Sequence, residues 1–396
     1  MRDPLFRMAL LLGLLSAVGP FAIDMYLPAL PMVAEDLGAS EAGVALTLTA
    51  YFLTFGIAQM IYGPMADAVG RKPPLVIGLA IFLLATVAAS LAPTLGWLVA
   101  ARAAQALGAA TLMAVPRAVI RDMATGPDAA RMMAAVMIVI SISPMLAPLT
   151  GSFVMVWGGW REIFAVLGAA ALISLMLVLF VLPETLPQER RQPVRLRSMA
   201  AGAKRLLTDR RFMGLTMVGG FGMASFFVFL STASFVYTRQ FGLSPTGFSI
   251  AFAVNAVGFF SASQFVGTLG RMFGMERVIS VAIAGFLGAT TALAVAVGLG
   301  AETLVVVVAG LFLANACLGL VIPTSMVLAL DPHPDIAGLA SSLGGTIQML
   351  TGGVMIALTG LAMEATAFGM VVAIAICAGL AWLSAVISLP RQRVAI

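Results

Sequence analysis

Long apolar runs, separated by short polar turns, follow one another along the whole chain. A helix needs about 20 residues to cross the hydrocarbon core of a bilayer. Runs of roughly this length lie between turn signals such as Gly70-Arg71-Lys72-Pro73-Pro74. The pattern therefore predicts an all-α integral membrane protein with twelve transmembrane helices. We place them at residues 6–30, 42–65, 75–92, 95–120, 130–156, 162–182, 212–238, 246–268, 278–298, 303–329, 335–361 and 366–389.

The composition also indicates a bilayer as the solvent of this chain. Apolar residues make up 61% of it and charged residues only 10%, and the mean hydropathy is +1.07. A soluble domain carries roughly 25% charged residues. The chain holds one histidine, His333, and two cysteines, Cys317 and Cys377, which lie in apolar runs. We therefore expect no metal, no cofactor and no enzymatic activity, because metal clusters and catalytic triads need residues that the chain lacks.

The basic residues predict the orientation in the membrane. With both termini in the cytoplasm, 18 of the 22 lysines and arginines lie inside, and only Arg161 and Arg239 lie outside. The other two, Arg102 and Arg117, fall within the fourth span. The net charge of +5 thus reflects topology, and we expect no nucleic-acid partner. The first apolar run continues into Asp24 without a cleavage site, so we expect a retained span.

One long connection divides the spans into two sets of six. We expect an N-terminal six-helix bundle at residues 1–182, a basic cytoplasmic linker at 183–211 and a C-terminal six-helix bundle at 212–396. The turn after the second span is weakly repeated after the eighth, as Gly267-Thr268-Leu269-Gly270-Arg271. Repeated six-helix halves predict a transporter with its site at the midplane. Within the linker, residues 198–207 fit a short interfacial helix and an irregular basic segment equally well.

The turn Gly63-Pro64-x-Ala66-Asp67-x-x-Gly70-Arg71-Lys72 resembles the cytoplasmic signature of the major facilitator superfamily, which has it between spans two and three. The resemblance implies two pseudo-symmetric six-helix halves and adds Asp122 to the same charge cluster. Asp67 and Arg71 lie four residues apart and can therefore pair on a helix. We interpret these residues as a conformational latch, and the alternative is an ordinary turn that fixes topology. The latch residues are Gly63, Asp67, Gly70, Arg71 and Asp122.

Asp24 is the one carboxylate among 17 that the pattern places deep within a span. A charge at that depth is costly, which makes it a functional candidate. Asp24 and Arg102 both lie about 10 Å below the outer surface at 1.5 Å per residue. We therefore expect them to pair and to couple transport to the proton gradient. The alternatives are a wet outer rim for Asp24, or an ion pair that only holds two helices together.

Two further motifs resemble those of exporters. Arg102-Ala-Ala-Gln105-Ala-Leu-Gly108 is similar to the fourth-span motif of proton-coupled drug exporters, whose arginine is linked to proton movement. Residues 143–151 resemble the antiporter motif of span five, with matches at Pro144, Pro148 and Gly151. Glycines of that motif are replaced at Ser143, Ala147 and Ser152. The alternative for this second motif is a helix kink with no bearing on the direction of transport.

Three segments resemble the Bcr/CflA branch of multidrug/H+ antiporters, namely residues 24–31, 231–237 and 248–255. This resemblance implies export of bicyclomycin, phenicols, sulfonamides or other small compounds in exchange for protons. Polar side chains within the spans are candidates for substrate binding, although each could instead join helices by hydrogen bonds. The candidates are Tyr26, Gln105, Asn255, Asn315 and Gln348, with Gln264 as a further residue that could face a cavity.

These observations favour a proton-coupled secondary active transporter that exports small, mostly hydrophobic drugs by alternating access. We expect a monomer in the bacterial cytoplasmic (inner) membrane, with a small-molecule drug, protons and the lipid bilayer as its partners. The alternative is a transporter of one metabolite, such as a sugar or an amino-acid derivative, but the spans offer few polar side chains for such a solute. A membrane-embedded enzyme or a channel fits less well, because nucleophiles are missing and paired halves suit alternating access.

Overall fold

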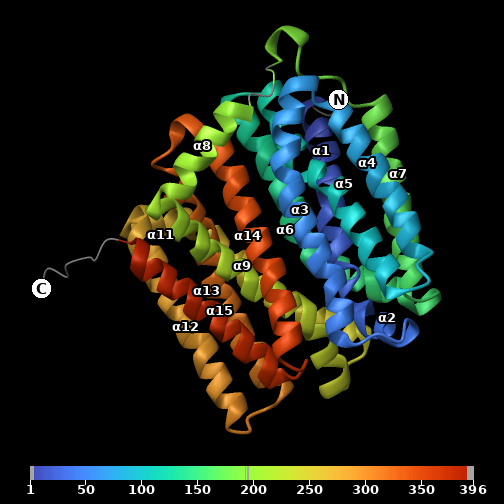
Figure 1. The fold of residues 1–396 in the computed structure, drawn as a ribbon, viewed down its shortest axis with the longest axis vertical. Helices are drawn as coiled ribbons and strands as arrows, with labels where there is room; N and C mark the ends of the chain where they lie inside the picture. The colour runs from blue at the N-terminus through green and yellow to red at the C-terminus, as the bar shows by residue number, and fades with distance from the viewer. Residues whose placement is uncertain (1–3, 192, 194–195, 390–396) are drawn as a thin grey trace, which may run out of the picture. The chain divides into compact units, whose positions relative to one another are not determined.

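The computed structural model describes residues 4–191, 193 and 196–389 (Figure 1). Twelve helical segments in this part of the chain are long and apolar enough to cross a membrane. No strand occurs among the described residues. The predicted all-α fold with twelve spans is therefore confirmed. Four arginines that the topology count places inside lie outside the described residues, namely Arg2, Arg195, Arg391 and Arg393.

The chain forms two compact units, and the first comprises residues 1–195 together with 244–250. In its helical core, α5 packs against α3, α4 and α1, while α6 packs against α1 and α7 against α4 (Figure 1). A short 3-10 turn, η2 (Gln188–Arg190), follows the last span. The spans of this unit are α1 (Pro4–Asp24) with η1 (Leu27–Ala29) and α2 (Leu30–Asp36), α3 (Glu41–Val69), α4 (Lys72–Ser90), α5 (Leu95–Met123), α6 (Gly126–Trp157) and α7 (Trp160–Phe180).

The first span is interrupted where the hydrophobic pattern predicts one helix over residues 6–30. α1 ends at Asp24, the chain turns at Met25 and Tyr26, and η1 then begins. The interruption has a local cause, because a proline displaces the carbonyl four residues before it and gives it no N–H to bond. For Pro28 that carbonyl belongs to Asp24. The candidate acid therefore lies at a helix end and not in the middle of a helix.

The short helix that follows this break is fixed to the rest of its unit. Asp36, the last residue of α2, accepts hydrogen bonds from Trp160 Nε1, at 3.0 Å, and from Arg161 Nη1. Arg161 also donates to the carbonyl of Ala92 at 3.1 Å and lies over the Trp160 ring, with 4.2 Å between its Cζ and the ring centroid. The segment after the break is thus held at the start of α7.

The second unit comprises residues 196–243 and 251–396. Its central helix is α9 (Arg210–Phe235), which packs against α13, α14 and α15, while α12 packs against α13 and α15. The predicted span 246–268 ends earlier, because the helix breaks at Phe265. The other elements are α8 (Leu196–Thr208), η3 (Val236–Gln240), α10 (Pro245–Gln264), α11 (Val266–Phe273), α12 (Met275–Gly298), α13 (Leu304–Leu330), η4 (Pro334–Ile336), α14 (Ala337–Ala362) and α15 (Ala367–Ser388).

Short polar side chains set where several spans begin. A serine, threonine or aspartate before the first helical residue accepts a hydrogen bond from a backbone N–H of the first turn, which no carbonyl of the helix can reach. Asp209 does this for α9, with the N–H groups of Arg211 at 2.8 Å and Phe212 at 3.0 Å. The same arrangement starts α3, α5, α13 and α15, at Ser40, Thr94, Thr303 and Thr366.

Part of the predicted linker forms a helix, α8, and not an irregular segment. α8 packs against α9 and α14 (Figure 1). Its Leu206 is buried, and Arg205 forms an ion pair with Asp335 at 2.6 Å. A Cβ on Gly202 would lie 2.6 Å from the side chain of Leu339, so the two helices approach closely there. Of the two interpretations of residues 198–207, the helix is correct.

Candidate functional site

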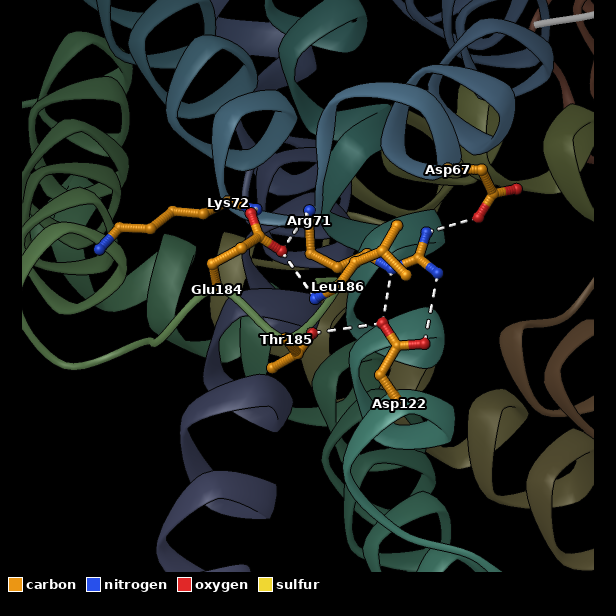
Figure 2. A network of polar contacts seen from close by, with 7 residues as sticks. All are labelled: Asp67, Arg71, Lys72, Asp122, Glu184, Thr185 and Leu186. Carbon is orange, nitrogen blue, oxygen red and sulfur yellow. Dashed lines mark hydrogen bonds and ion pairs between the residues drawn. The ribbon is translucent and has the colours of Figure 1, made fainter. Parts of the chain in front are cut away.

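Arg71 is the centre of the polar cluster that we interpret, from the sequence motif, as a conformational latch (Figure 2). Its Nη1 lies 2.6 Å from Asp67 Oδ1, and its Nε and Nη2 donate to the two carboxylate oxygens of Asp122, at 2.7 and 3.3 Å. Thr185 donates to Asp122 as well, at 3.3 Å. Burial opposes the charge, but Asp122 and Asp67 hold the pKa of the Arg71 guanidinium above its ordinary value. The structure thus brings Asp67, Arg71 and Asp122 together.

Glu184 belongs to the same cluster, although the sequence analysis did not single it out. Its carboxylate accepts hydrogen bonds from the backbone N–H groups of Arg71, Lys72 and Leu186, at 2.9, 3.1 and 2.9 Å (Figure 2). Two of these groups lie at the start of α4, so Glu184 caps that helix from the loop after α7. The available signal was an acid directly after a span, in Leu182-Pro183-Glu184-Thr185.

The two glycines of the signature differ in what the structure requires of them. Gly70 has φ +106°, a conformation that side chains disfavour, and a Cβ there would lie 2.5 Å from an oxygen of Glu184. Gly63 lies within α3, and a Cβ there would meet nothing within 4 Å. Gly70 is therefore required by both backbone and packing, whereas the structure shows no close helix approach at Gly63.

Arg102 lies fully buried in α5, at 0% exposure, inside a cage of aromatic rings. Its Cζ is 4.4 Å from the ring centroid of Tyr51, 4.9 Å from that of Tyr26 and 5.9 Å from that of Phe164. Nη1 donates to the carbonyl of Ala22 at 2.9 Å and to Gln105 Oε1. Nε and Nη2 have no hydrogen-bond partner among the described residues. The guanidinium thus faces π electrons and keeps two donors unused.

The expected ion pair between Asp24 and Arg102 is not formed, so that prediction is wrong for this structure. No nitrogen of Arg102 lies within 4 Å of the Asp24 carboxylate, and Asp24 is 5% exposed. The two residues do come from packed helices, α1 and α5, and Arg102 bonds the carbonyl of Ala22, two residues before Asp24. The matched depths were therefore informative, but the direction of the arginine side chain was not predicted.

Two of the substrate candidates are part of this buried network. Gln105 donates through Nε2 to Thr86 Oγ1 at 2.8 Å and accepts from Arg102, and it is fully buried. Tyr26 is also fully buried and accepts a hydrogen bond from Thr47 Oγ1 at 3.3 Å. Neither side chain faces an open cavity in this structure. Both contact Arg102 in this structure, and their role in substrate binding stays a prediction.

The other candidates lie in the second unit. Asn255 is buried and donates to the carbonyl of Ala251, four residues earlier in α10, at 3.1 Å. Asn315 is buried in α13. Gln348 of α14 is half-buried and lines a cavity of about 10 Å³ with Thr216, a space for about one water molecule. Gln348 thus lies at a small cavity, and Gln264 is exposed at the end of α10.

The antiporter-like segment of α6 carries a contact with the break in the first span. Pro144 and Pro148 lie within the helix, which continues through both. A Cβ on Gly151 would lie 2.1 Å from the carbonyl oxygen of Met25, so only glycine fits. The next residue, Ser152, donates to the carbonyl of Pro245 at 2.8 Å and lies 2.7 Å from Ser249 Oγ. The motif therefore places the backbone of α6 at Gly151 directly beside Met25, the residue that follows Asp24.

Comparisons with known proteins assign this architecture. The chain is 34% identical to the uncharacterized MFS-type transporter YdgK of Bacillus subtilis, over 89% of this chain and 88% of the relative. It is 28% identical to a bicyclomycin resistance protein homolog of Haemophilus influenzae, over 88% of each. The structure of a D-xylose-proton symporter, 16% identical, matches with a TM-score of 0.76 over 97% of each chain and shows the same fold. Residues 12–357 match the family model of the Major Facilitator Superfamily, and the chain belongs to that family.

Proposed function

We propose that this protein exports small, mostly hydrophobic drugs in exchange for protons, by alternating access between two six-helix halves. The Haemophilus influenzae relative is named for bicyclomycin resistance, and the Asp24–Met25 break packs directly on the antiporter-like segment. The protein would work as a monomer in the bacterial cytoplasmic membrane, with both termini in the cytoplasm. The proton gradient would supply the energy for export, and no cofactor would be needed.

The observation that carries this proposal is the arrangement of Asp24 and Arg102. A carboxyl group at a helix end within a span is costly to ionise, because the partial negative charge of that helix end adds to desolvation. Arg102 lies nearby with two unused donors. When Asp24 releases its proton to water, its carboxylate would turn to Nε and Nη2 of Arg102, and reprotonation would release it again. Proton binding would thus change the contacts between α1 and α5.

The latch would control the conformational change. Arg71 holds α3 and α5 together through Asp67 and Asp122, while Glu184 ties the loop after α7 to the start of α4. Four spans are thereby joined at one end of the first unit. These contacts would have to rearrange together when that end opens, which favours one conformation over the other.

The test is Asp24→Asn in energised membrane vesicles, with Asp128→Asn as the control. Asp128 is an exposed carboxylate whose contact with Arg131, at 3.4 Å, lies at the start of α6. Asp24→Asn should abolish bicyclomycin and phenicol export driven by a pH gradient while the protein still reaches the membrane, and the control should retain it. Undiminished pH-driven export by Asp24→Asn, or saturable import of one metabolite by the wild type, would overturn the proposal.

A further inference from the structure

The spans of the first unit differ in what they expose. α7 exposes a series of large apolar side chains, as a helix in contact with lipid does: Val166, Leu172, Ile173, Met176, Leu179 and Phe180. Among the described residues of α5, Trp97 in the first turn is the only large apolar side chain that is exposed. Beyond the first turn, the exposed residues of α5 are Ala100, Arg117 and Arg121, while Leu107 and Met113 are half-buried. α5 therefore exposes no large apolar side chain beyond its first turn, and its exposed arginines suit water or a solute better than lipid.

Arg117 is one of these exposed residues, and it has no partner in the part of the chain that the structure describes. It is exposed and follows Pro116, six residues before α5 ends at Met123, which is about 9 Å along the helix. Its guanidinium makes no hydrogen bond or ion pair with any residue that the structure describes. The nearest acid on α5, Asp122, is occupied by Arg71 and Thr185. An unpaired cation at this depth requires a functional explanation, because it is costly in hydrocarbon.

Of the charged residues within the spans, Arg117 is the arginine that a solute would meet. Away from helix ends, the described spans hold Arg102 and Arg117, with Asp24 at the break of the first span, and all three belong to the first unit. Arg102 is enclosed by aromatic rings and has no exposed surface. Even when Asp24 is ionised, the two arginines leave these spans with a net positive charge.

We propose that Arg117 selects the drugs that this protein exports: it binds an oxygen-bearing acceptor group of a neutral or anionic drug and repels lipophilic cations. The proposal rests on the proposed drug export and names the class of drug. A guanidinium presents N–H donors in a planar fork that matches the paired oxygens of nitro, carboxylate or sulfonyl groups. At an effective dielectric constant of about 20, a cation roughly 10 Å from Arg117 would be disfavoured by about tenfold.

The experiment measures export of two probes by the full protein in liposomes under an imposed pH gradient. Chloramphenicol is the neutral probe with a nitro group, and tetraphenylphosphonium is the lipophilic cation. Arg117→Gln removes the charge and the fork, whereas Arg117→Lys keeps the charge and loses the fork. Arg121→Gln is the matched control, because Arg121 is an exposed arginine one turn further along the same helix.

The wild type should export chloramphenicol and at least about tenfold less tetraphenylphosphonium. Arg117→Gln should raise the relative export of the cation by about tenfold, while Arg117→Lys should keep the cation excluded but weaken chloramphenicol binding. The control should behave as the wild type. Equal export of both probes by the wild type, or an unchanged ratio in Arg117→Gln, would overturn the proposal.

Failure of the proposed function gives a different result. If the wild type exports neither probe, drug export itself is wrong, and equilibrium binding of the same two probes to the purified proteins decides the role of Arg117. Selective binding of chloramphenicol that Arg117→Gln removes would support an acceptor-binding site. Binding that does not change with this substitution would contradict it.

Discussion

Two arginines of the first unit, Arg71 and Arg102, are both buried and yet have opposite surroundings. Every side-chain nitrogen of Arg71 contacts a carboxylate oxygen of Asp67 or Asp122. Arg102 contacts no carboxylate, and its charge is balanced by one carbonyl, one amide and the faces of aromatic rings. Each of the three nitrogens of the first guanidinium bonds a carboxylate, whereas two of the three nitrogens of the second have no hydrogen-bond partner among the described residues.

The difference shows how the same side chain serves two purposes. A guanidinium that donates from each of its nitrogens to an anion holds its neighbours in place, and it is costly to separate from them. A guanidinium with unused donors can accept a carboxylate without first losing one. We therefore expect substitutions at Arg102 to impair transport and substitutions around Arg71 to alter stability and the conformational equilibrium.

The largest effect is expected at Arg102. Arg102→Gln should lower the export rate by about a hundredfold or more, because hydrogen bonds to a charged group are worth about 1.5–3 kcal/mol each. Arg102→Lys should not restore export, since an ammonium group lacks the planar faces that stack on Tyr26 and Tyr51. Export in vesicles is measured beside the exposed control Arg131→Gln. Normal export by Arg102→Gln would show that its open donors have no role.

A moderate effect is expected at Glu184. Glu184→Ala removes the cap of α4 and should destabilise the protein by about 1 kcal/mol, a value limited by the exposure of this carboxylate. Thermal unfolding in detergent measures it, with Glu189→Ala as a control, because Glu189 is an exposed acid of the same loop. Equal melting temperatures for Glu184→Ala and the control would contradict a structural role of Glu184 and the loop after α7.

The smallest effect is the response of the latch to pH. Burial alone would raise the pKa of Glu184, but the N–H groups of Arg71, Leu186 and Lys72 and the charge of Arg191 hold it below its ordinary value of 4.5. A carboxyl pKa that is lower in the folded state stabilises the fold above the unfolded pKa, and this is lost as pH falls through the folded pKa. The melting-temperature difference between wild type and Glu184→Gln should therefore stay constant from pH 8 to about 5 and shrink at lower pH. If the difference already disappeared near pH 7, Glu184 would take up its proton there, which would contradict a lowered pKa.

The sequence predicted the elements that depend on local patterns. The twelve spans followed from apolar runs, and the contact between Asp67 and Arg71 followed from their spacing of four. Asp122 was added by resemblance, and the structure places it 2.7 Å from Arg71. Glu184 was missed because it contacts Arg71 across 113 residues. No periodicity within a helix carries information about such a contact.

The Asp24–Arg102 pair shows a different limit. Counting residues from the ends of two helices gives the depth of each side chain but not the direction in which it points around the helix axis. The interruption by Pro28 turns the chain directly after Asp24, and Tyr26 stacks on the guanidinium. The neighbouring levels of the two residues on α1 and α5 were therefore predictable, whereas their contact depends on the packing of α1, α3, α5 and α7.

The broken first span has a mechanical consequence. Hydrogen bonds from Trp160 and Arg161 to Asp36 hold its last segment in place, and Met25 packs closely against Gly151. α1 would therefore pivot at the joint after Asp24. α1 has 21 residues and is a lever arm of about 32 Å. A rotation of about 10° at the joint would move the N-terminal end of α1 by about 5 Å while displacing Asp24 hardly at all, by the geometry of a rigid helix. Under the proposed proton coupling, the gain or loss of one proton at this joint would thus be amplified into a large displacement at the far end of the same helix.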